Sequence, residues 1–74
     1  MKAEQVMTLA INTITRWNDE YLEAGETLDL ISVANLSFLE SELKTIQAAG
    51  SNKNLWTQNT RYALQLAYAI LDSN

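Results

Sequence analysis

Only two glycines and no proline interrupt this chain of 74 residues, and this scarcity of helix breakers constrains the fold more than any other feature. Gly25 and Gly50 divide the chain into three segments of similar length. Because glycine adopts the left-handed conformation without steric cost, it often stands at the end of a helix. The two positions therefore predict three helices, one in each segment.

The spacing of apolar residues supports this division. From Ala3 to Ala24 the apolar positions alternate at intervals of four and three, as they do on the core-facing side of a helix. We expect helices over about residues 3–24, 28–49 and 55–72, with Thr27 capping the second and Asn52 or Asn54 the third. Short connections make consecutive helices antiparallel neighbours, so the prediction is an all-α, antiparallel three-helix bundle formed by residues 1–74 as a single domain.

The core of this bundle is expected to draw on the large apolar residues of all three segments. They are Val6, Met7, Ile11, Ile14, Trp17, Tyr21, Leu28, Ile31, Phe38, Leu39, Leu43, Ile46, Leu55, Tyr62, Leu66 and Ile70.

The third segment carries a second apolar stripe, formed by Leu64, Tyr68 and Leu71, roughly opposite the first. A helix that is apolar on two faces is usually buried on two sides. A domain of this size buries only about 60% of the surface of its unfolded chain, so a partner often completes the burial. These three residues, helped by Leu9, Leu30 and Val33, predict a protein interface that forms a homodimer or a hetero-complex.

An acidic group surrounds the first turn and comprises Asp19, Glu20, Glu23, Glu26 and Asp29. It forms either a docking patch for a basic partner or a solvated helix end. The oxygen-ligand pattern of a calcium loop is missing, so no metal is expected there. The net charge of −4 argues against a phosphate backbone as the main ligand and is compatible with a basic protein partner.

Two polar residues, Asn35 and Glu42, share the apolar face of the second segment. An unpaired carboxylate is costly to bury. Glu42 therefore either pairs with Arg16 or Arg61, or lies at the edge of the face and reaches water.

The chain has no histidine and no cysteine, which removes the commonest general base, thiolate nucleophiles and the main transition-metal ligands. We expect no enzyme activity and no cofactor. The N-terminus does not have the pattern of a signal peptide, and no apolar run reaches about 18 residues, so we expect a cytoplasmic protein.

The sequence thus predicts a non-catalytic protein–protein interaction module. Two alternatives stay open. One is a small acidic inhibitor or adaptor, of the type that mobile elements or phages encode, acting through its acidic first turn. The other is a weak helix-turn-helix-like nucleic-acid binder that reads bases with the polar start of the third helix, formed by Asn52, Lys53, Asn54, Gln58, Asn59 and Arg61.

Overall fold

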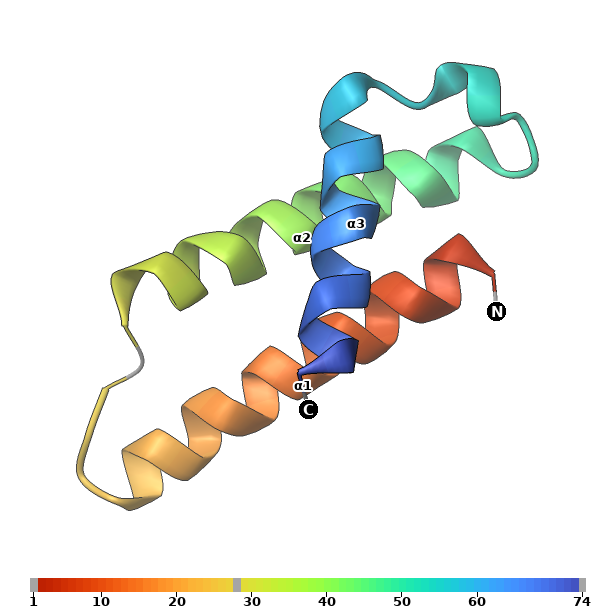
Figure 1. The fold of residues 1–74 in the computed structure, drawn as a ribbon. Helices are drawn as coiled ribbons and strands as arrows, with labels where there is room; N and C mark the ends of the chain where they lie inside the picture. The colour runs from red at the N-terminus through yellow and green to blue at the C-terminus, as the bar shows by residue number, and fades with distance from the viewer. Residues whose placement is uncertain (1, 28, 74) are drawn as a thin grey trace.

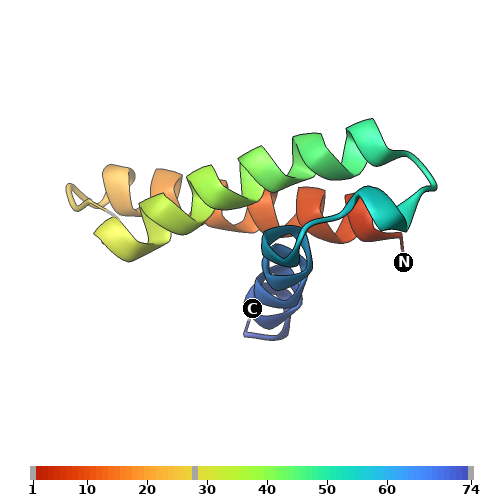
Figure 2. The ribbon, with the colours of Figure 1, turned by 90° about the horizontal axis from the view of Figure 1, so that it is seen from above.

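The computed structural model describes residues 2–27 and 29–73, with the side chain of Leu30 left out. Its elements are α1 (Ala3–Glu23), α2 (Leu30–Ala49), the one-turn 3₁₀ helix η1 (Lys53–Leu55) and α3 (Gln58–Asp72). α1 and α2 form an antiparallel hairpin, and α3 crosses both on one face of that hairpin (Figures 1 and 2). The expected all-α, three-helix architecture is confirmed. Among the described helices, none is both long and apolar enough to cross a membrane.

α1 ends at the glycine that the sequence predicted. Gly25 has a φ of 77°, its N–H donates to the Leu22 carbonyl at 3.0 Å, and the Glu26 N–H donates to the Tyr21 carbonyl at 2.8 Å. This pair of bonds is the Schellman motif, which satisfies the last carbonyls of a helix. α2 likewise ends at Gly50, with a φ of 59°.

The starts of α2 and α3 differ from the prediction. Asp29, not Thr27, caps α2, because its carboxylate accepts the Ser32 N–H at 2.8 Å and the Ser32 hydroxyl at 3.0 Å. A carboxylate at this position also faces the positive end of the helix dipole. The predicted first residue of this helix, Leu28, lies outside the described residues.

At the third helix, Asn52 caps η1 by accepting the Asn54 N–H at 3.2 Å. α3 begins two residues after Trp56, capped by Thr57. The Thr57 hydroxyl accepts the Thr60 N–H, and the Thr60 hydroxyl accepts the Thr57 N–H, each at 3.2 Å. This reciprocal capping box moves the start from the predicted residue 55 to Gln58.

The core lies where the three helices meet. The buried residues are Val6, Met7, Ala10, Thr13 and Ile14 of α1, Leu39, Ile46 and Ala49 of α2, and Thr60, Ala63 and Ala67 of α3. The buried residues of α3 are all small, which lets its backbone approach the hairpin closely. These small residues were absent from the predicted core.

The predicted core is correct only in part. Val6, Met7, Ile14, Leu39 and Ile46 are buried, while Ile11, Trp17, Phe38, Leu43, Leu66 and Ile70 pack against them half-buried. Tyr21, Ile31, Leu55 and Tyr62 are exposed, so their assignment to the core was wrong.

The length of α3 explains this difference. Its 15 residues span about 22 Å at 1.5 Å per residue, whereas the molecule is 43 Å long. Because α3 crosses the hairpin near its middle, it leaves the end with the α1–α2 turn uncovered (Figure 1). We call residues 15–38 the open half and the rest of the hairpin the covered half. No residue of the open half is buried, as far as the structure describes it.

Candidate interaction surfaces

An apolar surface lies beside α3 on the open half. Phe38 of α2 and Tyr62 of α3 are in ring contact, with centroids 6.1 Å apart and planes tilted by 53°. Ile31 lies seven residues before Phe38 and therefore shares its side of α2. Trp17 and Tyr21 continue the buried stripe of α1 into the same half. We call these five residues the open face.

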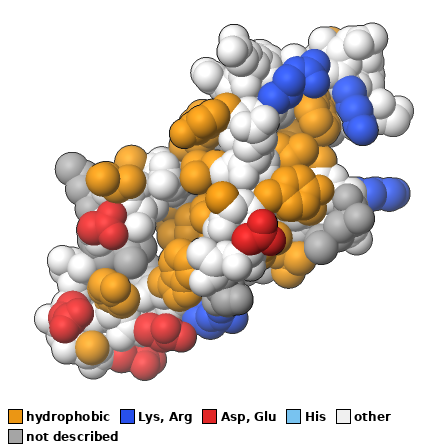
Figure 3. All heavy atoms as spheres, in the orientation of Figure 1, with side chains coloured by type: hydrophobic (Ala, Val, Ile, Leu, Met, Phe, Trp, Pro, Cys, Tyr) orange, Lys and Arg blue, Asp and Glu red, His pale blue; other side chains and the backbone are white. Residues whose placement is uncertain are grey.

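The open face has the composition of a binding surface. The side chains of Ile31 and Tyr62 are 74% and 60% exposed, whereas Trp17 and Phe38 are half-buried against the core. Figure 3 shows hydrophobic side chains gathered over the hairpin and on both sides of α3. Large exposed apolar patches commonly mark interfaces, and Trp and Tyr are enriched among the residues that dominate binding energy.

The interface predicted from the sequence is divided by the fold. Leu64 and Leu71 are half-buried against the core, and Tyr68 is 46% exposed. Leu9 is exposed and lines a separate hollow near the N-terminus. Val33 is exposed on the open half, and the side chain of Leu30 lies outside the described residues.

The distance along α2 shows the separation. Val33 lies 13 residues before Ile46, which is about 20 Å along a helix. Ile46 lines the same cleft as Leu64 and Tyr68. The structure therefore does not bring the predicted interface residues together on one surface.

That cleft is an open hollow of about 860 Å³ between the start of α1, the end of α2, η1 and α3. The ammonium nitrogen of Lys53 lies 5.7 Å from the centroid of the Trp56 ring, which is cation–π range. The indole Nε1 of Trp56 is buried without a hydrogen-bond partner. Because this atom is covered, the cleft offers apolar side chains and the charged residues Lys2, Glu4 and Lys53 rather than a free indole donor.

The acidic group lies at the opposite end of the hairpin. Asp19, Glu20, Glu23 and Glu26 are exposed there, and Figure 3 shows acidic side chains gathered at that end. Asp29 has a structural role, because the hydrogen bonds from the Ser32 N–H and then the Ser32 hydroxyl lower the pKa of its carboxyl. Within the described ranges, no group of three or more acidic residues is placed to hold a metal ion.

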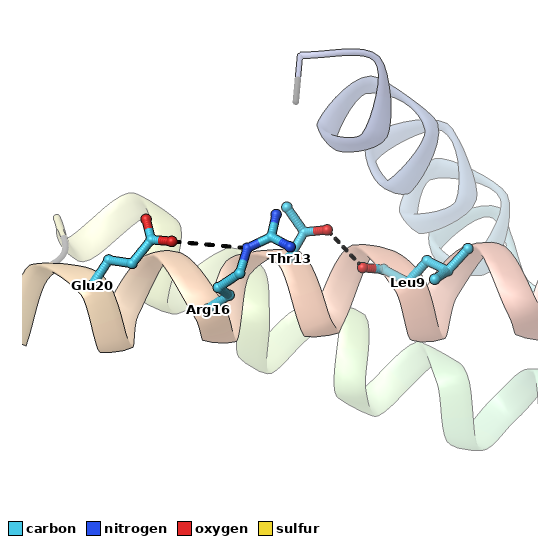
Figure 4. A network of polar contacts seen from close by, with 4 residues as sticks. All are labelled: Leu9, Thr13, Arg16 and Glu20. Carbon is cyan, nitrogen blue, oxygen red and sulfur yellow. Dashed lines mark hydrogen bonds and ion pairs between the residues drawn. The ribbon is translucent and has the colours of Figure 1, made fainter.

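The middle of α1 holds a polar network (Figure 4). Arg16 Nε lies 4.0 Å from Glu20 Oε1, and the buried Thr13 hydroxyl donates to the Leu9 carbonyl at 2.8 Å. An exposed ion pair of this length contributes little to stability. The other acidic residues of this end, Asp19, Glu23 and Glu26, are exposed, so the acidic end presents its negative charge to solvent.

Glu42 has a partner that neither sequence-based alternative named. The hydroxyl of Thr60, which is fully buried, donates to Glu42 Oε1 at 2.8 Å across the contact between α2 and α3. Glu42 itself is half-buried, so the carboxylate combines this bond with partial access to water. Asn35 is also half-buried, on the open half.

The polar residues considered for base reading lie around η1 and the first turn of α3. Asn52, Lys53, Asn54, Gln58, Asn59 and Arg61 are all exposed there. Their exposure leaves the nucleic-acid alternative a prediction that a binding assay can test.

The sequence reasoning missed the open face because all five of its residues fit core stripes. A signal was present in the small residues Thr60, Ala63 and Ala67, whose spacing of three and four marks the true contact side of α3.

Comparisons with known proteins add no further information. No protein family, curated protein or solved structure matches this chain.

Proposed function

We propose that this chain is a non-catalytic protein–protein interaction module that binds its partner through the open face. The observation that carries the proposal is the combination of four aromatic residues and Ile31 on a face that α3 leaves uncovered. This moves the centre of the expected interface from the Tyr68 side of α3 to its Tyr62 side.

The contacts of the open face suit it for binding. Trp17 and Phe38 are held by core contacts, and the Tyr62 ring packs on Phe38. Side chains that are already ordered lose less conformational entropy when a partner binds. Ile31 and Tyr62 supply the apolar area that a partner would remove from water.

Affinity capture with matched variants tests this proposal. Immobilised wild type is expected to retain a protein partner that Ile31→Glu loses, because the new carboxylate would be buried unpaired in the interface. Val33→Glu is the control, since Val33 is also exposed on α2 but lies two residues away, on another side of the helix. Far-UV circular dichroism checks that both variants fold. A partner retained equally by all three proteins would refute the open face as the binding site.

A second candidate function rests on the acidic end of the hairpin. Exposed Asp19, Glu20, Glu23 and Glu26 would steer the chain toward a basic protein, which it would inhibit or recruit. The double variant Glu20→Lys, Glu23→Lys should then lose a partner that Ile31→Glu keeps, and the loss should be reproduced by high salt in the wild type. An unchanged partner list in the double variant would contradict this candidate.

A further inference from the structure

We infer that the partner of the open face is a second copy of this chain, in a two-fold dimer whose hairpins run in opposite directions. The inference rests on the proposed function and specifies the partner that the same face takes. Shape, apolar surface and charge each support it.

Shape is the first argument. α1 and α2 form one layer, and α3 crosses one face of that layer near its middle, leaving the half with the α1–α2 turn bare on that face (Figure 2). A two-fold axis pairs a surface with the same surface of another copy. Two copies can therefore pair through this face, with the open half of each copy lying beside α3 of the other.

The apolar surface is the second argument. The interlocked arrangement covers Ile31, Tyr21 and Tyr62 of both copies at once, which are the exposed members of the open face. It places α3 of each copy on the uncovered part of the other hairpin, so that the two α3 helices lie between the two hairpins. The chain has only 74 residues, and four of its buried apolar residues are alanines, so its own core buries little apolar area. A second copy would add the burial that so small a core lacks.

Charge selects the orientation. Parallel hairpins would bring the two acidic ends together, and their like charges would repel. Opposed hairpins separate these ends and bring each one toward α3 of the other copy. α3 carries two charged residues, Arg61 near its start and Asp72 at its last position, and both are exposed. The acidic end of one copy thus faces a helix of zero net side-chain charge, with Arg61 as its cation, instead of a second acidic end.

Sedimentation equilibrium tests the dimer and its surface. The wild type should show a concentration-dependent monomer–dimer equilibrium at micromolar concentrations. Ile31→Glu should raise the dissociation constant about tenfold or more, as removal of a central contact does, whereas Val33→Glu and Tyr68→Glu should leave it within about twofold of wild type. A wild type that stays monomeric at high micromolar concentration overturns the dimer. A dimer broken by Tyr68→Glu and not by Ile31→Glu overturns the open face as its interface.

Charge exchange tests the orientation. Arg61→Glu should weaken the dimer, as should the double variant Glu20→Lys, Glu23→Lys, and combining all three substitutions in one chain should restore it. Because the chain has no cysteine, pairs of single cysteines report proximity without background. Glu23→Cys mixed with Arg61→Cys should give disulfide-linked heterodimers, and a predominance of Glu23→Cys homodimers would overturn the opposed arrangement.

The failure of this inference is distinguishable from the failure of the proposed function. A monomeric wild type that still captures a different protein, with capture abolished by Ile31→Glu and kept by Val33→Glu, overturns self-pairing and supports the interaction module. A monomer whose captured proteins are insensitive to Ile31→Glu overturns both.

Discussion

The covered half and the open half of the hairpin carry similar apolar patterns but have different environments. In the covered half, Met7 and Leu39 are fully buried because α3 lies over them. In the open half, Tyr21 and Ile31 occupy equivalent stripe positions and remain exposed. The difference shows that a stripe becomes core only where a third helix covers it, and that the same pattern stays exposed elsewhere.

The sharpest test of this comparison is truncation of one apolar residue from each half. Leu39→Ala should lower the free energy of unfolding by about 2–5 kcal/mol, because it leaves a cavity in a packed core. Ile31→Ala should change it by less than about 0.5 kcal/mol, since the side chain is 74% exposed. Urea denaturation of dilute protein measures both. Equal losses would show that the open half is packed as tightly as the covered half.

Enlarging the contact side of α3 should break the covered half selectively. Ala63 is fully buried where α3 meets the hairpin, so Ala63→Leu should cost about 1–3 kcal/mol through overpacking. Ala69→Leu adds the same group at an exposed position of the same helix and should be nearly neutral. Thermal unfolding compares the two variants. A destabilised Ala69→Leu would mean that α3 contacts the hairpin through a different side.

The turn of the open half should respond to backbone strain alone. A Cβ at Gly25 would meet no atom within 4 Å, but its φ of 77° disfavours L-residues. Gly25→Ala should therefore cost about 1 kcal/mol. Gly25→Asn should cost less, because asparagine tolerates this conformation.

Amide hydrogen exchange locates that loss. In Gly25→Ala, exchange should accelerate mainly for residues 15–38, of which none that the structure describes is buried. Uniform acceleration across both halves would indicate that the hairpin opens only as a whole.

The smallest expected effect is the acid response of the start of α2. Hydrogen bonds from Ser32 lower the pKa of Asp29 in the folded chain below its ordinary value. The charged Asp29 cap therefore stabilises α2 fully when the pH is above the ordinary pKa of aspartate. This contribution is lost as the pH falls through the lowered pKa of the folded chain. The Ser32 amide resonance should shift over this range, and Asp29→Asn should abolish the shift while keeping a capping side chain. A Ser32 amide that titrates identically in the variant would exclude this cause.

The sequence was sufficient for features that depend on local conformation. The number of helices and the ends at Gly25 and Gly50 followed from the need for positive φ at a helix end. The starts of α2 and α3 were misplaced because adjacent polar residues compete as caps. Thr27 and Asp29 both suit the role, and so do Asn54 and Thr57.

The open face could not be predicted because periodicity identifies a side of a helix but not how far its partner extends. Tyr62 and Ile31 match the core pattern as well as Met7 does, yet they are exposed. Whether these two side chains are buried depends on the direction in which α3 crosses the hairpin. The small residues Ala63 and Ala67 are buried where α3 meets the hairpin, and the predicted core of large apolar side chains did not include them.

The hydroxyl of Thr60 has a consequence for the order in which this protein assembles. It accepts the Thr57 N–H in the first turn of α3 and donates its only proton to Glu42 of α2. The same hydroxyl therefore caps α3 and joins α3 to the hairpin. Each of the two hydrogen bonds holds the hydroxyl in the orientation that the other bond needs. A chain in which α3 has detached exposes this hydroxyl to water, which competes for both bonds. Helix formation at residue 58 and closure of the core should thus occur as one cooperative step, with no stage in which α3 is fully capped but undocked.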